Sequence, residues 1–223
     1  MEILKGLPVA QAINEELIKE SHEAGIKPHL AIIRVGERPD DCSYERGATK
    51  KMDKVGFDCT SYVFPQDITD EEFQKEFDKI NKDDNIDGIL LLRPLPKHIN
   101  EKAIEERINP VKDLDGISPI NLAKVYAGDV NGFAPCTAEA VIEMLDYAGI
   151  DLTGKRVTVV GRSLVIGKPV AMMLMKKNAT VTVCHTKTKD MAGTCRNAEV
   201  LVAAAGSAKM IKPDYVADGA VVI

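Results

Sequence analysis

The sequence predicts an α/β protein with two domains, and three observations lead to this prediction. Short β-branched segments alternate with segments of helical periodicity over most of the chain, which is the pattern of parallel βαβ units. A glycine-punctuated unit of this kind begins near residue 156. The chain has 223 residues, 45% of them hydrophobic, which suffices for two ordinary cores. We place the boundary near Ser118, giving domains 1–118 and 119–223.

In the first domain, helical spacing of apolar residues alternates with buried-strand patterns. We expect, in order, a helix over 9–24 ending at Gly25, a strand over 28–35, a helix over 41–54 capped by Asp40 or Asp41, a strand over 57–64, a helix over 67–80 and a strand over 87–92. The pattern Thr69-Asp70-Glu71-Glu72 is a capping box that starts the third helix. Arg93-Pro94-Leu95-Pro96 ends the last strand, because proline cannot donate to a sheet.

The second domain follows a turn-rich piece over 109–129 and a loop over 131–137. We expect a helix over 138–147 capped by Thr137, then strands near 157–160, 179–184, 200–204 and 219–223 with helices between them. The last strand has no following turn or helix, which predicts that a further segment follows in the natural protein.

The segment RVTVVGRSLVIGKP, residues 156–169, predicts a dinucleotide site. Gly161 would form the tight turn out of the strand, and Gly167 would let the next helix pack closely. The free N–H groups and positive dipole end at the helix N-terminus favour phosphate. Because the spacing is not G-x-G-x-x-G, the motif alone is weak, and an ordinary βαβ turn is the alternative.

The end of the strand over 179–184 favours NADP over NAD. NAD-binding folds usually place a carboxylate there for the ribose hydroxyls, but here the strand leads into His185, Thr186 and Lys187. Arg162 lies across the turn and would favour a 2′-phosphate. The alternatives are that Arg162 is a solvated loop charge and that His185 is a capping or core histidine.

In the first domain, Tyr44 and Asp115 are candidates for binding a flat heterocycle. Tyr44 lies near the start of its predicted helix and offers an aromatic wall. Asp115 could accept from an amino-pyrimidine edge with both carboxylate oxygens. The alternatives are a half-buried helix residue for Tyr44 and a turn residue beside Gly116 for Asp115.

Composition limits the partners and the compartment. The net charge is −5 and the basic residues are evenly spread, so we expect no nucleic-acid binding. Five separated cysteines without a C-x-x-C pair indicate reduced thiols. No signal peptide or membrane span is recognisable. We therefore predict a cytoplasmic protein.

Seven segments resemble one known family, the bifunctional methylenetetrahydrofolate dehydrogenase/methenyltetrahydrofolate cyclohydrolase (FolD) proteins. They are LAIIRVGERPDD followed by Tyr44, DGILLLRPLP, NPVKDLDGISPIN, PCTAEAV, VVGRSLVIGKPVAMML, ATVTVCHTKT and DGAVVI. The resemblance covers nearly the whole chain in the family's order. It implies a Rossmann-like second domain, with folate and NADP in a cleft between the domains.

The resemblance also implies roles for particular residues. NADP would be held by Gly161, Arg162, Ser163 and Thr186, with Gly167 shaping the turn. Tyr44 would stack on tetrahydrofolate one-carbon derivatives, and Asp115 would hold the pterin edge. A homodimer through the second domain is a further implication.

The chain departs from the family pattern at two positions. Ala48 stands where the family has a catalytic lysine four residues after the tyrosine, and Leu92 stands where it has a glutamine. On a regular helix Lys51 lies about 60° around from position 48 and could lean back toward it, whereas Lys50 lies about 160° around. Lys51 is thus the candidate replacement, and solvated lysines are the alternative.

Three functions remain open from the sequence. The first is NADP-dependent oxidation of 5,10-methylenetetrahydrofolate, with hydrolysis of the methenyl product impaired by Ala48 and Leu92. The second is another two-domain dehydrogenase, of the shikimate or amino-acid type. The third is a folate- or nucleotide-binding protein without turnover.

Overall fold

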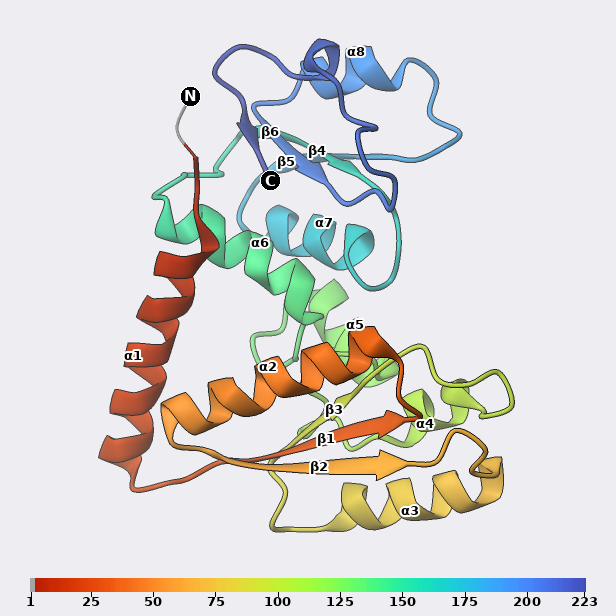
Figure 1. Cartoon of the computed structure of the whole chain (residues 1–223). Helices are drawn as coiled ribbons and strands as arrows, with labels where there is room; N and C mark the ends of the chain where they lie inside the picture. The colour runs from red at the N-terminus through yellow and green to blue at the C-terminus, as the bar shows by residue number, and fades with distance from the viewer. Residues whose placement is uncertain (1–2) are drawn as a thin grey trace. The chain divides into compact units, whose positions relative to one another are not determined.

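The computed structural model describes residues 3–223, which form two compact α/β units (Figure 1). Lys5–Asn121 form one unit, and 122–223 form the other together with the described residues before Lys5. Each unit contains a parallel sheet. The predicted architecture of two α/β domains is therefore confirmed.

The Lys5–Asn121 unit has a three-stranded sheet in the order β2-β1-β3. Its elements are α1 (Gly6–Ala24), β1 (His29–Val35), α2 (Pro39–Val55), β2 (Asp58–Phe64), α3 (Asp70–Lys82), β3 (Gly88–Leu91) and α4 (Glu101–Arg107). Helix α2 lies on one face of the sheet and α3 on the other (Figure 1). Because residues alternate between faces along a strand, Ile33 packs with α3 whereas Ile32 packs with α2.

The second unit has a four-stranded sheet in the order β5-β4-β6-β7. Its elements are α6 (Cys136–Tyr147), β4 (Arg156–Val160), α7 (Gly167–Lys176), β5 (Thr180–Cys184), α8 (Met191–Arg196), β6 (Val200–Ala203), the 3-10 helix η1 (Pro213–Tyr215) and β7 (Val221–Val222). Val157 and Val159 are buried with α6 and α7 on one face, whereas Val160 packs with α8 and η1 residues on the other.

One segment predicted as turns contains a helix, α5 (Pro119–Ala127). The Ser118 hydroxyl accepts a hydrogen bond from the Asn121 N–H at 3.1 Å, and Pro119 occupies a first-turn position where a missing N–H costs nothing. The Asp, Gly and Pro residues just before α5 are typical of turns, so the local pattern predicted turns and no helix.

Two predicted helix caps are wrong. Helix α2 begins at Pro39 with Arg38 as its N-cap residue, because proline's fixed φ suits the first helical position, so Asp40 and Asp41 lie inside the first turn. Helix α6 begins at Cys136 after Pro135, which places Thr137 inside the helix. Thr69 does cap α3 with Glu72 in a capping box, as predicted.

Within residues 3–223, no helix is both long enough and apolar enough to cross a membrane. The same residues contain no cluster of histidine, cysteine and carboxylate side chains suited to a metal ion.

Candidate functional site

The turn between β4 and α7 is closed by two glycines in contact with backbone. Gly161 has φ +129°, and a Cβ there would lie 2.3 Å from the carbonyl oxygen of Ala204, which follows β6. A Cβ on Gly167 would lie 2.2 Å from the Gly161 oxygen and 2.7 Å from the Arg162 nitrogen. No side chain fits at either position, so the start of α7 lies directly against the turn. This is the close approach that a phosphate-binding turn needs.

Ser163 organises the N-terminus of α7. Its hydroxyl accepts from the Ile166 N–H at 3.1 Å and from the Gly167 N–H at 3.4 Å, and its carbonyl accepts from the Lys168 N–H at 3.0 Å. The side chain is exposed, so the hydroxyl proton can still donate outward. Ser163 is therefore placed both to shape the turn and to donate to an anion in front of it.

The carboxyl ends of β4 and β5 lie side by side, with Val160 paired to Cys184. Arg162 and Thr186 follow these two ends and are both exposed. The first carboxylate after β5 is Asp190, whose side chain accepts from the Gly193 N–H at 3.0 Å and caps α8. No acid therefore follows β5 directly to receive a ribose, as the sequence indicated.

His185 has a local structural role in the turn after β5. Its Nδ1 accepts from the Lys187 N–H at 3.1 Å, and its backbone N–H donates to Thr188 Oγ1 at 2.8 Å. His185 therefore stabilises this turn, whereas Asp190 caps the helix that follows.

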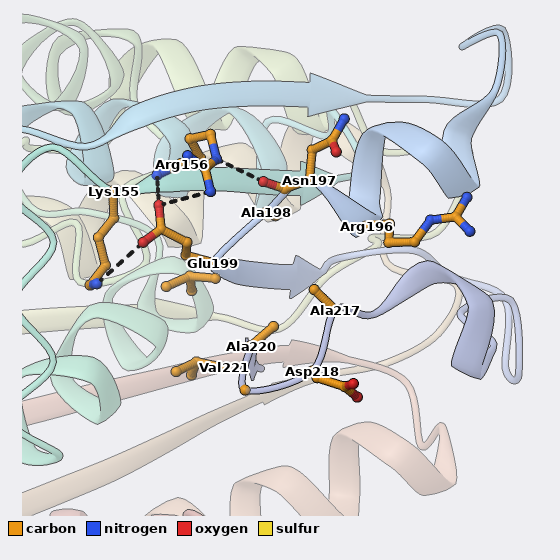
Figure 2. Close-up of a pocket in the computed structure, with 12 residues that line it drawn as sticks. Lys155, Arg156, Arg196, Asn197, Ala198, Glu199, Ala217, Asp218, Ala220 and Val221 are labelled. Atoms are coloured by element: carbon orange, nitrogen blue, oxygen red, sulfur yellow. Dashed lines mark hydrogen bonds and ion pairs between the residues drawn. The ribbon is translucent and has the colours of Figure 1, made fainter.

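A pocket of about 600 Å³ lies at the opposite edge of the same sheet (Figure 2). It is lined by residues at the amino ends of β4, β6 and β7, among them Lys155, Arg156 and Glu199. Glu199 pairs with Lys155 and with Arg156, at 3.5 Å each. Because ligands of open parallel sheets bind beyond the carboxyl ends of the strands, this pocket is not the predicted nucleotide site.

In the first unit, the two positions that depart from the family pattern share one apolar cluster. Leu92 is 8% exposed and packs with Leu30 and Ile32. Ala48 packs against the same cluster from α2. Hydrocarbon therefore occupies the two positions where the resemblance places an amine and an amide.

Tyr44 lies one turn before Ala48 on α2 and is 56% exposed, so its ring has surface to offer a ligand. Lys50 and Lys51 are also exposed, whereas Ala48 is partly buried. Asp115 follows Leu114, which packs on the same apolar cluster. The structure thus places Tyr44 one turn from Ala48 on α2, brings Ala48, Leu92 and Leu114 into one apolar cluster, and leaves Lys51 exposed.

Arg38 also belongs to this region, although no sequence motif marked it. Its guanidinium binds Asp41 through two hydrogen bonds, of 2.9 Å from Nε and 2.7 Å from Nη2. It also donates to the carbonyls of Arg93 at 3.2 Å and Pro94 at 3.1 Å. Arg38 therefore ties the start of α2 to the Pro-Leu-Pro loop. The spacing of Arg38 and Asp41, three residues apart at a helix start, was the available signal.

Arg34 and Glu45 also went unrecognised, although they fix α2 beside Tyr44. Arg34 Nε donates to Glu45 Oε2, and the two side chains are 13% and 14% exposed. Burial raises the pKa of Glu45, but hydrogen bonds from Ser61 and Arg34 outweigh it, so the pKa lies below its usual 4.5. The ion pair is therefore formed at neutral pH.

We expect Glu45→Gln to lower the free energy of unfolding by about 2 kcal/mol at pH 7, because it leaves the largely buried Arg34 without its counter-charge. A group with a depressed folded pKa contributes stability above its unfolded pKa, and this is lost as pH falls through the folded value. Urea unfolding at pH 7 and below pH 4 should thus show a difference from wild type that shrinks in acid. A constant difference would contradict the charge-based explanation.

Two family models match the chain in sequence. The catalytic domain of tetrahydrofolate dehydrogenase/cyclohydrolase matches residues 4–115, and the NAD(P)-binding domain of the same enzyme matches residues 135–223. Each match falls largely within one of the two α/β units. The predicted family is therefore confirmed.

Curated and solved proteins agree with this assignment. The bifunctional protein FolD of Clostridioides difficile is 52% identical over 100% of this chain and 78% of its own length. The crystal structure of FolD from Campylobacter jejuni has a TM-score of 0.95 at 36% identity, covering 100% of this chain and 80% of that one. The Trypanosoma brucei enzyme, complexed with NADP cofactor and inhibitor, has a TM-score of 0.91 at 34% identity, covering 99% of this chain and 77% of its own. The chain belongs to the tetrahydrofolate dehydrogenase/cyclohydrolase family.

Proposed function

We propose that the chain oxidises 5,10-methylenetetrahydrofolate to 5,10-methenyltetrahydrofolate with reduction of NADP. The observation that carries the proposal is the β4–α7 turn, where no side chain fits at Gly161 or Gly167. The models of both domains of the tetrahydrofolate dehydrogenase/cyclohydrolase family match the chain, and the turn lies within the NAD(P)-binding one. NADP, when bound, supplies the hydride acceptor.

The residues of the second unit would bind and orient NADP. The positive dipole end at the start of α7 and the outward hydroxyl of Ser163 can receive the pyrophosphate. Arg162 and Thr186 lie at the adjacent ends of β4 and β5, where they can bind a 2′-phosphate. Hydride transfer depends mainly on holding the two reacting carbons together, so these contacts supply most of what the protein must do.

On the folate side, we propose that Tyr44 stacks on the pterin and that the Asp115 carboxylate accepts hydrogen bonds from its amino-pyrimidine edge. The exposed ring of Tyr44 supports the first role, and the ion pair between Asp115 and Arg93 supports an ionised carboxylate for the second.

We propose that hydrolysis of the methenyl product is impaired. Water must attack a cation while a proton moves between folate nitrogens, so a positioned proton carrier matters more here than in hydride transfer. Ala48 and Leu92 have no group that exchanges protons, and they pack in an apolar cluster. Any residual hydrolysis is assigned to Lys51, reaching from the exposed side of α2.

The test is a spectrophotometric assay with 5,10-methylenetetrahydrofolate and either nucleotide. We expect NADP reduction and slower hydrolysis of methenyltetrahydrofolate. Absence of nicotinamide reduction with both nucleotides would reject the proposal, and tight folate binding without turnover would identify a binding protein instead.

Arg162→Ala is expected to weaken NADP binding by about tenfold or more and to leave NAD binding nearly unchanged, because only NADP has a 2′-phosphate for the guanidinium. Calorimetric titration with both nucleotides measures this. Lys168→Ala is a matched control that removes an exposed cation from the first turn of α7. Equal losses of both nucleotides in Arg162→Ala would show that Arg162 contacts the shared pyrophosphate.

A homodimer through the second domain and a cytoplasmic location remain part of the proposal. The homodimer rests on the family resemblance, and the cytoplasmic location rests on composition. The proposal also includes the expected absence of nucleic-acid binding, which rests on the net charge of −5. Gel filtration with light scattering measures the oligomeric state.

A further inference from the structure

Arg93 lies directly after β3 and Leu92, and its side chain is only 20% exposed. Its Nε is buried and has no hydrogen-bond partner within residues 3–223. An unpaired buried donor is costly, so the rest of the guanidinium must find strong partners. The functions assigned so far do not account for an arginine at this position.

Three carboxylates converge on this one guanidinium. Nη1 donates to Glu105 at 3.1 Å and lies 3.5 Å from Glu101, both on α4. Nη2 lies 3.8 Å from Asp115 Oδ2, which is longer than a hydrogen bond. The Arg93–Asp115 interaction is therefore a charge attraction, and three negative charges compete for one positive charge.

The position of Arg93 is fixed by its surroundings. Arg38 donates to the Arg93 and Pro94 carbonyls. Glu101 also accepts from the Leu95 N–H at 2.8 Å, which holds the following loop to α4. Arg93 is thus held in place on both its backbone and its side chain.

We propose that Arg93 is a positioning residue that keeps the Asp115 carboxylate ionised and in place for folate, while Glu101 and Glu105 compete for its charge. This rests on the proposed function, in which Asp115 binds the pterin edge. A carboxylate accepts with both oxygens only when it is ionised, and a cation about 4 Å away favours that form.

The charges around the cluster set the direction of the competition. Burial raises the pKa of Glu105, and the negative charges of Glu101 and Glu106 raise it further. The positive charges of Arg93 and Lys102 lower it, but the net pKa remains raised. Neutralising Glu105 would therefore remove a negative charge from the cluster and leave more of the Arg93 charge to Asp115.

The test is calorimetric titration with folic acid, a stable pterin, from pH 3 to 8, a range that includes the ordinary aspartate pKa of about 3.9. Arg93→Met keeps much of the side-chain stem without the charge. We expect the pH at which binding is half lost to rise by about one unit, with a smaller change at pH 8. Arg93→Lys should restore most of the wild-type profile.

Glu105→Gln should move the same midpoint to lower pH by less than Arg93→Met raises it, because the raised pKa of Glu105 leaves it only partly charged where Asp115 titrates. A merely structural role would weaken binding at every pH and leave both midpoints unmoved, and that result would overturn the proposal. If Arg93→Met does not fold, as NADP titration would show, a midpoint that fails to fall in Glu105→Gln overturns it alone.

Asp115→Asn tests the role of Asp115 separately from that of Arg93. If this variant binds folic acid as tightly as the wild type, the role of Asp115 is overturned, and the proposal for Arg93 with it. Turnover by the unmodified enzyme would still support the dehydrogenase function. Lost binding in Asp115→Asn with unmoved midpoints in the other variants would overturn only the role of Arg93.

Discussion

Replacing Ala48 with lysine and Leu92 with glutamine together is expected to speed hydrolysis of methenyltetrahydrofolate by about 100-fold or more, the usual contribution of a positioned acid–base group. Position 48 faces the apolar cluster that contains Leu92. A lysine there would be partly desolvated, which lowers its pKa toward neutrality, and a glutamine at 92 would supply a polar partner. The measurement is the decay of the methenyl chromophore, beside the hydride-transfer rate.

The single and control variants decide whether the amine is responsible. Ala48→Lys alone should gain less and should unfold more easily, because its ammonium would be packed against hydrocarbon without the amide. Ala48→Met with Leu92→Gln adds a side chain of similar length without an amine and should gain nothing. Lys51→Met should remove residual hydrolysis in the wild type and spare hydride transfer. Wild-type hydrolysis as fast as the hydride step would contradict the claim of impairment.

Gly167→Ala is expected to abolish measurable NADP binding and to destabilise the protein by about 3 kcal/mol, at the upper end of overpacking effects. The added Cβ would lie 2.2 Å from the Gly161 oxygen and 2.7 Å from the Arg162 nitrogen. Both are backbone atoms, so the start of α7 would have to move away from the turn that it closes. Thermal unfolding and calorimetric titration measure the two effects.

Gly47→Ala is the matched control for this substitution. Gly47 lies within α2, and nothing lies within 4 Å of a Cβ built there. Helix propensity alone should then stabilise the protein by about 0.5–1 kcal/mol and leave NADP affinity unchanged. If Gly167→Ala binds NADP as tightly as Gly47→Ala does, the close contact in the turn is not required for binding.

The sequence by itself determined the order of most helices and strands, because hydrophobic periodicity and glycine placement are local properties. Strand β4 and the turn after it could be predicted since Val157, Gly161 and Gly167 each have a local conformational reason. Helix α5 was missed because its start depends on one hydrogen bond, which the Asn121 N–H donates to the Ser118 hydroxyl.

The charged framework around Tyr44 and Asp115 was decided by the tertiary structure alone. Arg34 meets Glu45, and Arg93 meets Glu105, across 11 and 12 residues of chain. Pairing of this kind depends on how strands and helices pack, and no local pattern specifies it. The sequence likewise showed that Ala48 and Leu92 depart from the family, whereas only the fold showed that they share one apolar cluster. Sequence periodicity encodes which face of an element is buried, but the packing of elements decides which side chains meet there.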